Sequence, residues 1–568
     1  MGAAASPGIV RGPAFLCPCS QRLAIPRHAV GESELPQQLE RLEAAIRNAE
    51  HELHILQDET GKTLGKKEAE IFEVQKLLLH DATLLNEITG RCLREKINVE
   101  AALADTIEKL TSLFAQLKDP YYRERAADLR DLGQRLLEIL LRSPPGRLSL
   151  TLPEGSILVT GELLPSLTAQ LTQTRVAGLI AEGGGLTAHA VILARSLGIP
   201  TLVNVPNAVS KIRTGDCLVV DGLAGRVFIN PPKSILREYD RLEEDFKAHQ
   251  DALKEVIDLP AVTLDGVKVK LSANIGKTAD AEAAVRFKAE GIGLYRTEFV
   301  FLVEDHFPTE EEQYRIYRAT VERVKPRGVV IRALDVGSDK LLPYFPLPHE
   351  ANPSLGFRGT RLLLAHPEIL RTQLRSILRL SATHPVSLLF PMIGGVDEMV
   401  EARRIVESIK RDLSAAGEAF NAQIPLGAMI ETPAAAITAR RIAREADFLS
   451  IGTNDLVQYL LISDRTSPAM TAYYEPLHPA VLHVLKSVID TSGAESKEIS
   501  ICGEMAGNPA YIALLLGLGA RSLSVSPGEI LEIKKAIRSL RIERAESVAM
   551  RALELGTALE IKKCLQNP

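Results

Sequence analysis

One histidine stands where a phosphoryl group could be accepted. His189 follows the glycines at 183–185 and begins an apolar segment that continues to Val203. The pattern predicts a helix whose first turn holds His189, where free backbone N–H groups and the helix dipole favour an anion. A histidine in this place is suited to phosphorylation. Taken alone, the segment fits a structural histidine at the end of a glycine-capped helix equally well.

A second set of polar residues follows strand-like runs in the C-terminal part of the chain. The runs are 267–274, 291–295, 328–335, 386–391, 426–431, 448–454, 499–502 and 522–526. Eight strands alternating with helices over roughly 300 residues predict a (β/α)8 barrel, whose chemistry lies at the carboxyl ends of the strands. The polar residues at these ends are Arg296, Glu298, Arg332, Asp335, Glu431, Asn454, Asp455 and Cys502, and loops on the same face add Arg358 and Arg465.

Arginines that converge with carboxylates indicate a small phosphorylated acid bound together with a metal ion. Guanidinium groups bind phosphate and carboxylate through paired hydrogen bonds, and Glu431 and Asp455 offer the hard oxygen ligands that Mg2+ prefers. Any one of these residues could instead belong to a surface ion pair, but the set at successive strand ends favours function. Cys502 is either a buried structural thiol or a group that exchanges a proton.

The N-terminal half predicts an α/β domain interrupted by helices. Apolar residues spaced by three and four predict a helix from Leu35 to Leu56, with further helices over 68–85, 98–117 and 121–141. Short strands at about 5–10, 156–160, 176–179, 217–221 and 227–229 predict an α/β domain around this bundle. The predicted domains are 1–20 with 146–230 (α/β), 21–145 (inserted helical bundle), 231–258 (connecting helix) and 259–568 (barrel).

Composition excludes several classes of function. A chain of 568 residues must hold several domains, and its net charge of −5, without a basic block, argues against nucleic acid as the main partner. No apolar run reaches membrane-spanning length, which predicts a protein without membrane insertion that acts in the cytoplasm. The six cysteines lack the paired spacing of a structural zinc site and fit a reducing compartment.

With these motifs in view, the sequence resembles enzyme I of the bacterial phosphotransferase system over essentially its whole length. The similarity is carried by segments that are specific in combination. They are Gly184–Gly185 through His189 to Arg195, Gly293–Glu298, Phe390–Met392, Glu431–Ala435, Ile451–Leu456 and Cys502–Glu504. The glycine and histidine segment alone is shared with pyruvate phosphate dikinases and phosphoenolpyruvate synthases.

The resemblance implies a phosphoryl relay that uses Mg2+. A swivelling α/β domain would bring His189, the nucleophile, to phosphoenolpyruvate on the barrel and then to the phosphocarrier protein HPr on the helical bundle. Carried over to matching positions, Arg296, Arg332, Asn454 and Arg465 hold phosphoenolpyruvate, with Asp455 and Arg358 beside them. Glu431 and Asp455 ligate the metal, and Cys502 protonates the enolate to give pyruvate. The family also dimerises through its barrel.

Several positions depart from the family pattern without removing a reacting group. Ala188 stands where serine usually precedes the histidine, and Ser338 replaces a usual glycine. Glu162 and Leu164 stand where aspartate and threonine are common. Gln75 replaces a typical histidine in the helical bundle and bears on how the carrier docks.

Two other functions fit the sequence less well. A dikinase or synthase that makes phosphoenolpyruvate with ATP is disfavoured, because nothing before His189 resembles a nucleotide-binding domain. A regulatory protein that senses phosphoenolpyruvate without turnover need not keep a nucleophile, an acid and metal ligands together.

Overall fold

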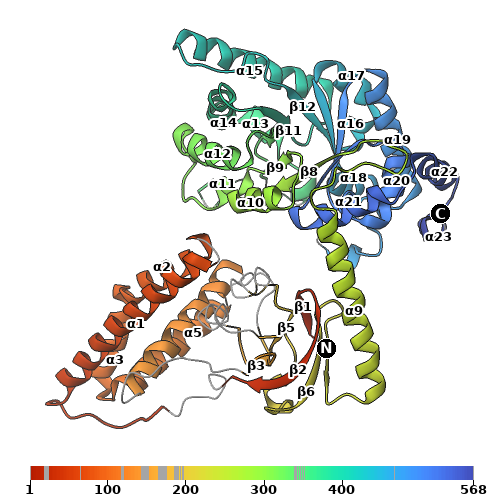
Figure 1. Cartoon of the computed structure of the whole chain (residues 1–568). Helices are drawn as coiled ribbons and strands as arrows, with labels where there is room; N and C mark the ends of the chain where they lie inside the picture. Colours follow the sequence, from red (N-terminus) through yellow and green to blue (C-terminus); the bar gives the residue numbers. More distant parts are fainter. Residues whose placement is uncertain are drawn as a thin grey trace. The chain divides into compact units, whose positions relative to one another are not determined.

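The chain forms two compact units, Met1–His249 and Gln250–Pro568 (Figure 1). The computed structural model describes residues 2–17, 25–63, 66–116, 120–141, 153–163, 176–183, 191, 194, 198–337, 342, 344, 345, 347, 350, 352–465 and 467–566. Within these residues, no helix combines the length and the apolar character that crossing a bilayer requires. The four predicted domain boundaries are finer than this division and stay predictions.

A seven-stranded sheet forms the α/β part of the first unit. Its strands are β1 (Ala3–Ser6), β2 (Ile9–Leu16), β3 (Ile157–Thr160), β4 (Gly178–Ala181), β5 (Thr201–Val203), β6 (Cys217–Asp221) and β7 (Arg226–Ile229), in the order β1-β5-β4-β3-β2-β6-β7. Strands β2 to β5 run parallel, and the outer pairs are antiparallel. Two strands, β1 and β2, stand where one N-terminal strand was predicted. Strand β5 lies at the end of the His189 segment, where the sequence pattern predicted no strand. A short helix, α8 (Ala208–Lys211), follows β5.

A helical bundle lies between β2 and β3 in the chain, as predicted. It consists of α1 (Leu35–Thr63), α2 (Lys66–Leu79), α3 (Ala82–Glu95), α4 (Val99–Gln116) and α5 (Pro120–Leu141). The predicted helix over 68–85 was wrong, because α2 ends at Leu79 and Asp81 caps α3 by accepting a hydrogen bond from the Leu84 N–H at 2.9 Å. The bundle has its own apolar core around Leu53, Phe72 and Leu132.

The second unit is a closed barrel of eight parallel strands, which confirms the predicted fold. The strands are β8 (Lys270–Ile275), β9 (Ile292–Tyr295), β10 (Val329–Arg332), β11 (Val386–Phe390), β12 (Leu426–Ile430), β13 (Phe448–Gly452), β14 (Glu498–Cys502) and β15 (Ser522–Val525). Each predicted strand-like run overlaps one of them. Helix α9 (Lys233–Glu255) fills the predicted connecting segment.

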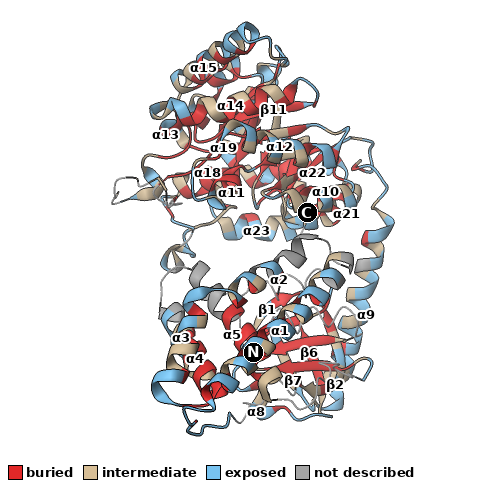
Figure 2. Cartoon of the chain, turned by 90° about the vertical axis from the view of Figure 1, so that its left-hand side faces the viewer, coloured by how far each residue is buried: buried red, intermediate tan, exposed pale blue. Residues whose placement is uncertain are grey.

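Helices cover the outside of the barrel (Figure 1). They are α10 (Thr278–Arg286), α11 (Glu298–Leu302), α12 (Glu310–Val324), α13 (Thr360–Ala365), α14 (Pro367–Ser381), α15 (Val396–Ala415), α16 (Pro433–Ile437), α17 (Ala439–Glu445), α18 (Thr453–Leu460), α19 (Pro479–Ala494), α20 (Ile512–Gly517), α21 (Ile530–Arg538), α22 (Ile542–Leu553) and α23 (Ala558–Gln566). Their inner faces are buried while their outer faces are exposed (Figure 2).

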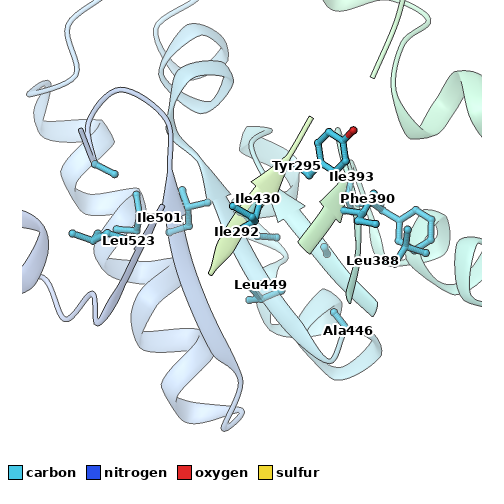
Figure 3. Packing of buried hydrophobic residues seen from close by; sticks show 14 of the residues in the cluster. Ile292, Tyr295, Leu388, Phe390, Ile393, Ile430, Ala446, Leu449, Ile501 and Leu523 are labelled. Carbon is cyan, nitrogen blue, oxygen red and sulfur yellow. The ribbon is translucent and has the colours of Figure 1, made fainter. Parts of the chain in front are cut away.

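Two apolar layers hold the barrel together. Outward-facing strand residues such as Ile430, Leu449 and Ile501 pack into one large cluster with the surrounding helices (Figure 3). Inside the barrel a much smaller cluster contains Leu294, Leu389, Met429 and Cys502. Because successive side chains of a strand point to opposite faces, the apolar strand positions anchor the barrel to its helices and leave the inward positions for other residues.

Gly427 tests how tightly the barrel interior is packed. A Cβ atom at this position would lie 2.3 Å from the ring of Phe448. We expect Gly427→Ala to destabilise the barrel by about 1–3 kcal/mol through overpacking. Gly493→Ala in α19 is the matched control, because its Cβ would meet no atom within 4 Å, and it should be neutral or stabilising by about 0.4–1 kcal/mol. Calorimetric unfolding of the full-length chain measures both, and equal midpoints would contradict the packing argument.

Candidate active site

A cavity at the carboxyl ends of the barrel strands brings together most of the predicted site residues. It is lined by Leu294, Arg296, Arg332, Asp335, Met429, Glu431, Gly452, Asn454, Asp455, Arg465, Cys502 and Gly503. Three guanidinium groups and three carboxylates therefore share this cavity. Such a composition suits a small anion that carries both phosphate and carboxylate groups.

Arg332 is held in place by buried carboxylates. It ends β10, and its Nη2 donates to Glu298 Oε1 and lies 3.4 Å from Asp335 Oδ2. All three side chains are less than a tenth exposed. A buried guanidinium that moved away from its carboxylates would leave uncompensated charges inside the protein. The two carboxylates therefore fix the guanidinium in one position. The cation at the floor of the cavity is thus preorganised for a ligand.

Arg358 lies behind the cavity and does not line it. Its Nε and Nη2 donate to the two carboxylate oxygens of Asp335 at 3.2 and 2.8 Å, and its side chain is 3% exposed. Gly337 allows this approach, because a Cβ there would lie 2.4 Å from Arg358 Cβ. The geometry assigns Arg358 to orienting Asp335 and, through it, Arg332. Arg358 is not among the residues that line the cavity, and its expected role in holding the substrate stays a prediction.

Glu431 and Asp455 form the acidic side of the cavity. Glu431 follows β12 and accepts a hydrogen bond from the Met392 backbone N–H at 2.7 Å. Burial and the neighbouring charge of Asp455 raise the pKa of Glu431 well above its ordinary value. Asp455 Oδ1 is buried and accepts no hydrogen bond from the described residues, although Arg465 Nη2 lies 3.7 Å away. A cation between the two carboxylates would relieve both features.

The two carboxylates are compatible with a divalent cation that takes its other ligands from water and substrate. Among the described residues, no three His, Cys, Asp and Glu side chains are grouped as a metal site would require. Mg2+ takes one or two carboxylates and completes its shell with water and substrate oxygens. Two carboxylates beside an anion-binding group of arginines match that preference.

The Gly452–Asp455 turn and the Cys502–Glu504 turn interlock at the cavity. Asn454 Oδ1 accepts from the Glu504 backbone N–H at 2.8 Å, and Asn454 Nδ2 donates to Glu504 Oε1 at 3.2 Å. Gly503 makes this possible, since its φ is +103° and a Cβ there would lie 2.7 Å from Asn454 Oδ1. These bonds orient the Asn454 amide at the edge of the cavity.

Cys502 ends β14 and reaches the cavity with a protonated thiol. Burial raises the pKa of the Cys502 thiol to about 11, against the weaker effect of the nearby Arg296 and Arg332 charges. Its Sγ donates to the Ile451 carbonyl at 3.3 Å and lies 3.6 Å from Ser450 Oγ. A thiol that keeps its proton at neutral pH is able to act as a general acid.

His189, Ala188, Leu164 and Ser338 lie outside the described residues. Their predicted roles stay predictions. Glu162 is described and pairs with Arg130 of α5. Gln75 is completely buried and donates to Asp131 Oδ2 at 3.0 Å, so it presents no surface to a partner.

Sequence reasoning missed the buried polar residues that hold the backbone of β10. Gln373 Nε2 donates to Thr297 Oγ1 at 3.1 Å, and Thr297 Oγ1 donates to the Arg332 carbonyl at 2.9 Å. Gln373 Oε1 also accepts from the Leu334 N–H at 2.9 Å. The available signal was Gln373 itself, a large polar residue among the mostly apolar buried positions of α14.

Known proteins are similar to this chain over its whole length. A family described as "PEP-utilising enzyme, PEP-binding domain" matches residues 250–542, "PEP-utilising enzyme, N-terminal" matches 1–125, and "PEP-utilising enzyme, mobile domain" matches 152–225. The phosphoenolpyruvate-protein phosphotransferase of Haemophilus influenzae is 39% identical over 100% of this chain and 98% of its own. That of Listeria monocytogenes is 39% identical with the same coverage, and that of Geobacillus stearothermophilus is 40% identical over 99% and 96%.

The barrel and its cavity are thus those of a phosphoenolpyruvate-utilising enzyme. Within that class, the chain belongs to the phosphoenolpyruvate-protein phosphotransferase family, enzyme I, as its motifs indicated.

The Cys502 environment predicts a thiol that resists alkylation. Because the thiolate is the reacting form, a buried cysteine with a pKa of about 11 should react slowly with iodoacetamide at pH 8. Cys564, which is half-buried near the end of α23, serves as the internal comparison. Mass spectrometry of the modified peptides should show Cys502 reacting at least about tenfold more slowly than Cys564. Equal rates in the folded protein would contradict the assignment of a protonated, enclosed thiol.

Proposed function

We propose that this chain takes the phosphoryl group of phosphoenolpyruvate onto His189, releases pyruvate, and passes the group to a histidine of the phosphocarrier protein HPr. This is the first step of the sugar phosphotransferase system. The observation that carries the proposal is the barrel cavity, in which Arg332, Glu431 and Cys502 come together from three different strands. Enzymes of this family are phosphotransferases.

In this proposal, cations of the barrel hold the substrate and stabilise charge. Arg296, Arg332 and Arg465 bind the phosphate and carboxylate groups, and Asn454 donates a hydrogen bond from the edge of the cavity. The neutral imidazole of His189 attacks the phosphorus atom, and the bond to the enol oxygen breaks. The arginines offset the charge on the transferring group, and the Cys502 thiol gives its proton to C3 of the enolate.

Members of the family use a divalent metal, and we assign this chain Mg2+ at Glu431 and Asp455. The bound ion would supply positive charge to the phosphate and enolate oxygens. The unbonded Asp455 Oδ1 and the raised pKa of Glu431 support a cation at this place. Arg358 and Arg332 hold the carboxylate of Asp335 between them, so that Asp335 does not compete with Glu431 and Asp455 for the metal.

The carrier is assigned to the helical bundle. Leu77 of α2 is 69% exposed, and contact with a protein partner would remove its apolar surface from water. Since Gln75 is buried, it acts on docking only through the position of α2.

The proposal further includes a cytoplasmic location and a homodimer formed through the barrel. Ile437, Ile462 and Tyr473 of the barrel unit are 83%, 84% and 65% exposed, and a subunit contact that covered them would remove apolar surface from water.

Replacement of His189 tests the division of labour between the two units. We expect His189→Ala to abolish acid-labile labelling of the protein by labelled phosphoenolpyruvate with Mg2+, together with pyruvate release. Calorimetric binding of phosphoenolpyruvate should change less than about threefold, because the proposed ligand site is built from barrel residues alone. Loss of binding in a folded variant would contradict this division. A wild-type protein that binds without label or pyruvate would be a sensor, and labelling that requires ATP would indicate a synthase.

Replacement of Glu431 tests the metal assignment. Glu431→Gln keeps the shape of the side chain but removes one anionic ligand, so we expect the Mg2+ concentration for half-maximal pyruvate release to rise at least about tenfold. Removing Mg2+ from the wild type with a chelator should abolish turnover. Glu407→Gln on α15 removes an exposed carboxylate that pairs with Lys410 and serves as the control. An unchanged Mg2+ requirement in Glu431→Gln would overturn the assignment.

A further inference from the structure

The interior of the barrel is polar along four neighbouring strands. Inward positions of (β/α)8 barrels are mostly bulky branched residues. Here β8, β13, β14 and β15 place small polar side chains inside, including Ser272, Ser450, Ser500, Ser522 and Ser524. Strand register sets Ser450 opposite Ser500, one layer below Gly452 and Cys502. Serine hydroxyl groups therefore line the barrel interior below Cys502, the proposed acid. We call this row of serines the hydroxyl column.

Two of these hydroxyls connect to the Cys502 thiol. Ser500 Oγ donates to Ser450 Oγ at 3.1 Å, and Ser450 Oγ lies 3.6 Å from Cys502 Sγ. Ser450 and Cys502 are 1% and 2% exposed, so this part of the path is closed to solvent. The other described partner of Sγ is the Ile451 carbonyl, which has no proton to give. Ser450 is thus the protic contact of the thiol among the described residues.

The hydroxyl column ends in a second cavity at the opposite end of the barrel. This cavity, of about 160 Å³, is lined by Ser272, Ser387, Ser500 and Ser522, with the exposed Lys270 and Glu498 beside them. Its size exceeds by far the ~15 Å³ that one water molecule needs, and its walls carry the polar partners that water requires. Ser500 therefore lies between a cavity that can hold water and Ser450, which contacts the enclosed thiol.

We propose that Ser450 and Ser500 form a proton relay that reprotonates Cys502 from the end of the barrel opposite the substrate. The inference rests on the proposed function, in which the Cys502 S–H bond breaks as a C3–H bond forms and a thiolate remains. Ser450 then gives its hydroxyl proton to the thiolate and takes the proton of Ser500. Ser500 in turn takes a proton from water in the second cavity, whose hydroxide exchanges with bulk solvent. The same steps in reverse return the proton when pyruvate is deprotonated.

A hydroxyl group suits this task because it both donates and accepts a hydrogen bond. When Ser500 donates to Ser450, the hydroxyl of Ser450 is free to donate to the sulfur. The relay also separates the path of the proton from the path of the substrate. The substrate occupies the cavity at the carboxyl ends of the strands when the enolate is protonated, and the proton arrives from the second cavity. Ser450 and Ser500 act through Cys502 and touch no substrate.

Isotope exchange separates proton delivery from phosphoryl transfer. Enzyme, Mg2+, phosphoenolpyruvate and carbon-labelled pyruvate are incubated in D2O without carrier. The carbon label moves between pyruvate and phosphoenolpyruvate even when the Cys502 thiol passes the same proton back and forth. Deuterium enters the pyruvate methyl group only if Cys502 exchanges its proton with solvent. The measured quantity is the deuterium incorporated per carbon exchange event, which does not depend on the amount of active enzyme.

We expect this ratio to fall about tenfold or more in Ser450→Ala and in Ser500→Ala, because the solvent path is cut while the thiol is retained. Ser450→Thr keeps the hydroxyl and should restore the ratio. Ser524→Ala is the matched control, since Ser524 lies inside the barrel opposite Cys502 in register but bonds to none of the described relay groups.

A wild-type ratio in both Ser450→Ala and Ser500→Ala would overturn the relay and place proton exchange on the substrate side. An equal fall in Ser524→Ala would also overturn it, since the effect would then be a general property of the barrel interior. A wild-type protein that exchanges no carbon label between pyruvate and phosphoenolpyruvate would instead refute the proposed function.

Discussion

The cavity depends on one buried guanidinium held between carboxylates. Arg332 contacts Glu298 and Asp335, and Arg358 closes the row on the far side of Asp335. The two positive and two negative groups thus offset one another within this row, although each alone would be costly to bury. Because Arg332 is fixed before any ligand arrives, it need not reorganise when charge develops on a substrate. Thr297 and Gln373 extend the same constraint to the backbone of β10.

Much of this site could be predicted from the sequence, because the parallel barrel obeys a simple rule. All carboxyl ends of its strands meet at one face, so residues as distant as Arg296 and Cys502 could be grouped from strand-like runs alone. The eight runs themselves follow from apolar strand positions that pack against helices. The cavity residues were found by position, and no contact between them had to be known.

The remaining features depend on contacts that no local pattern encodes. Arg358 sits in a loop on the correct face, yet its partner is Asp335 and its side chain points behind the cavity. Burial of Gln75 depends on Asp131, 56 residues away in the chain. Strand β5 has three residues, too few for a periodic signal, and the break before α3 rests on a single capping aspartate. In each case, the deciding partner is distant or the element is short.

Gly452 has a consequence for how this family can change. Glu431 Oε2 lies 2.5 Å from where a Cβ on Gly452 would stand, so the carboxylate uses the volume that any other residue would claim. The two positions are neighbours on adjacent strands, and neither can vary alone without moving the other. Glu431 Cβ would lie only 2.9 Å from the same point, so a sequence that enlarges residue 452 must shift the backbone at one of the two positions or lose the side chain at 431. Positions 431 and 452 are therefore expected to covary as a pair, and the glycine is as much a part of the acidic group as the carboxylate itself.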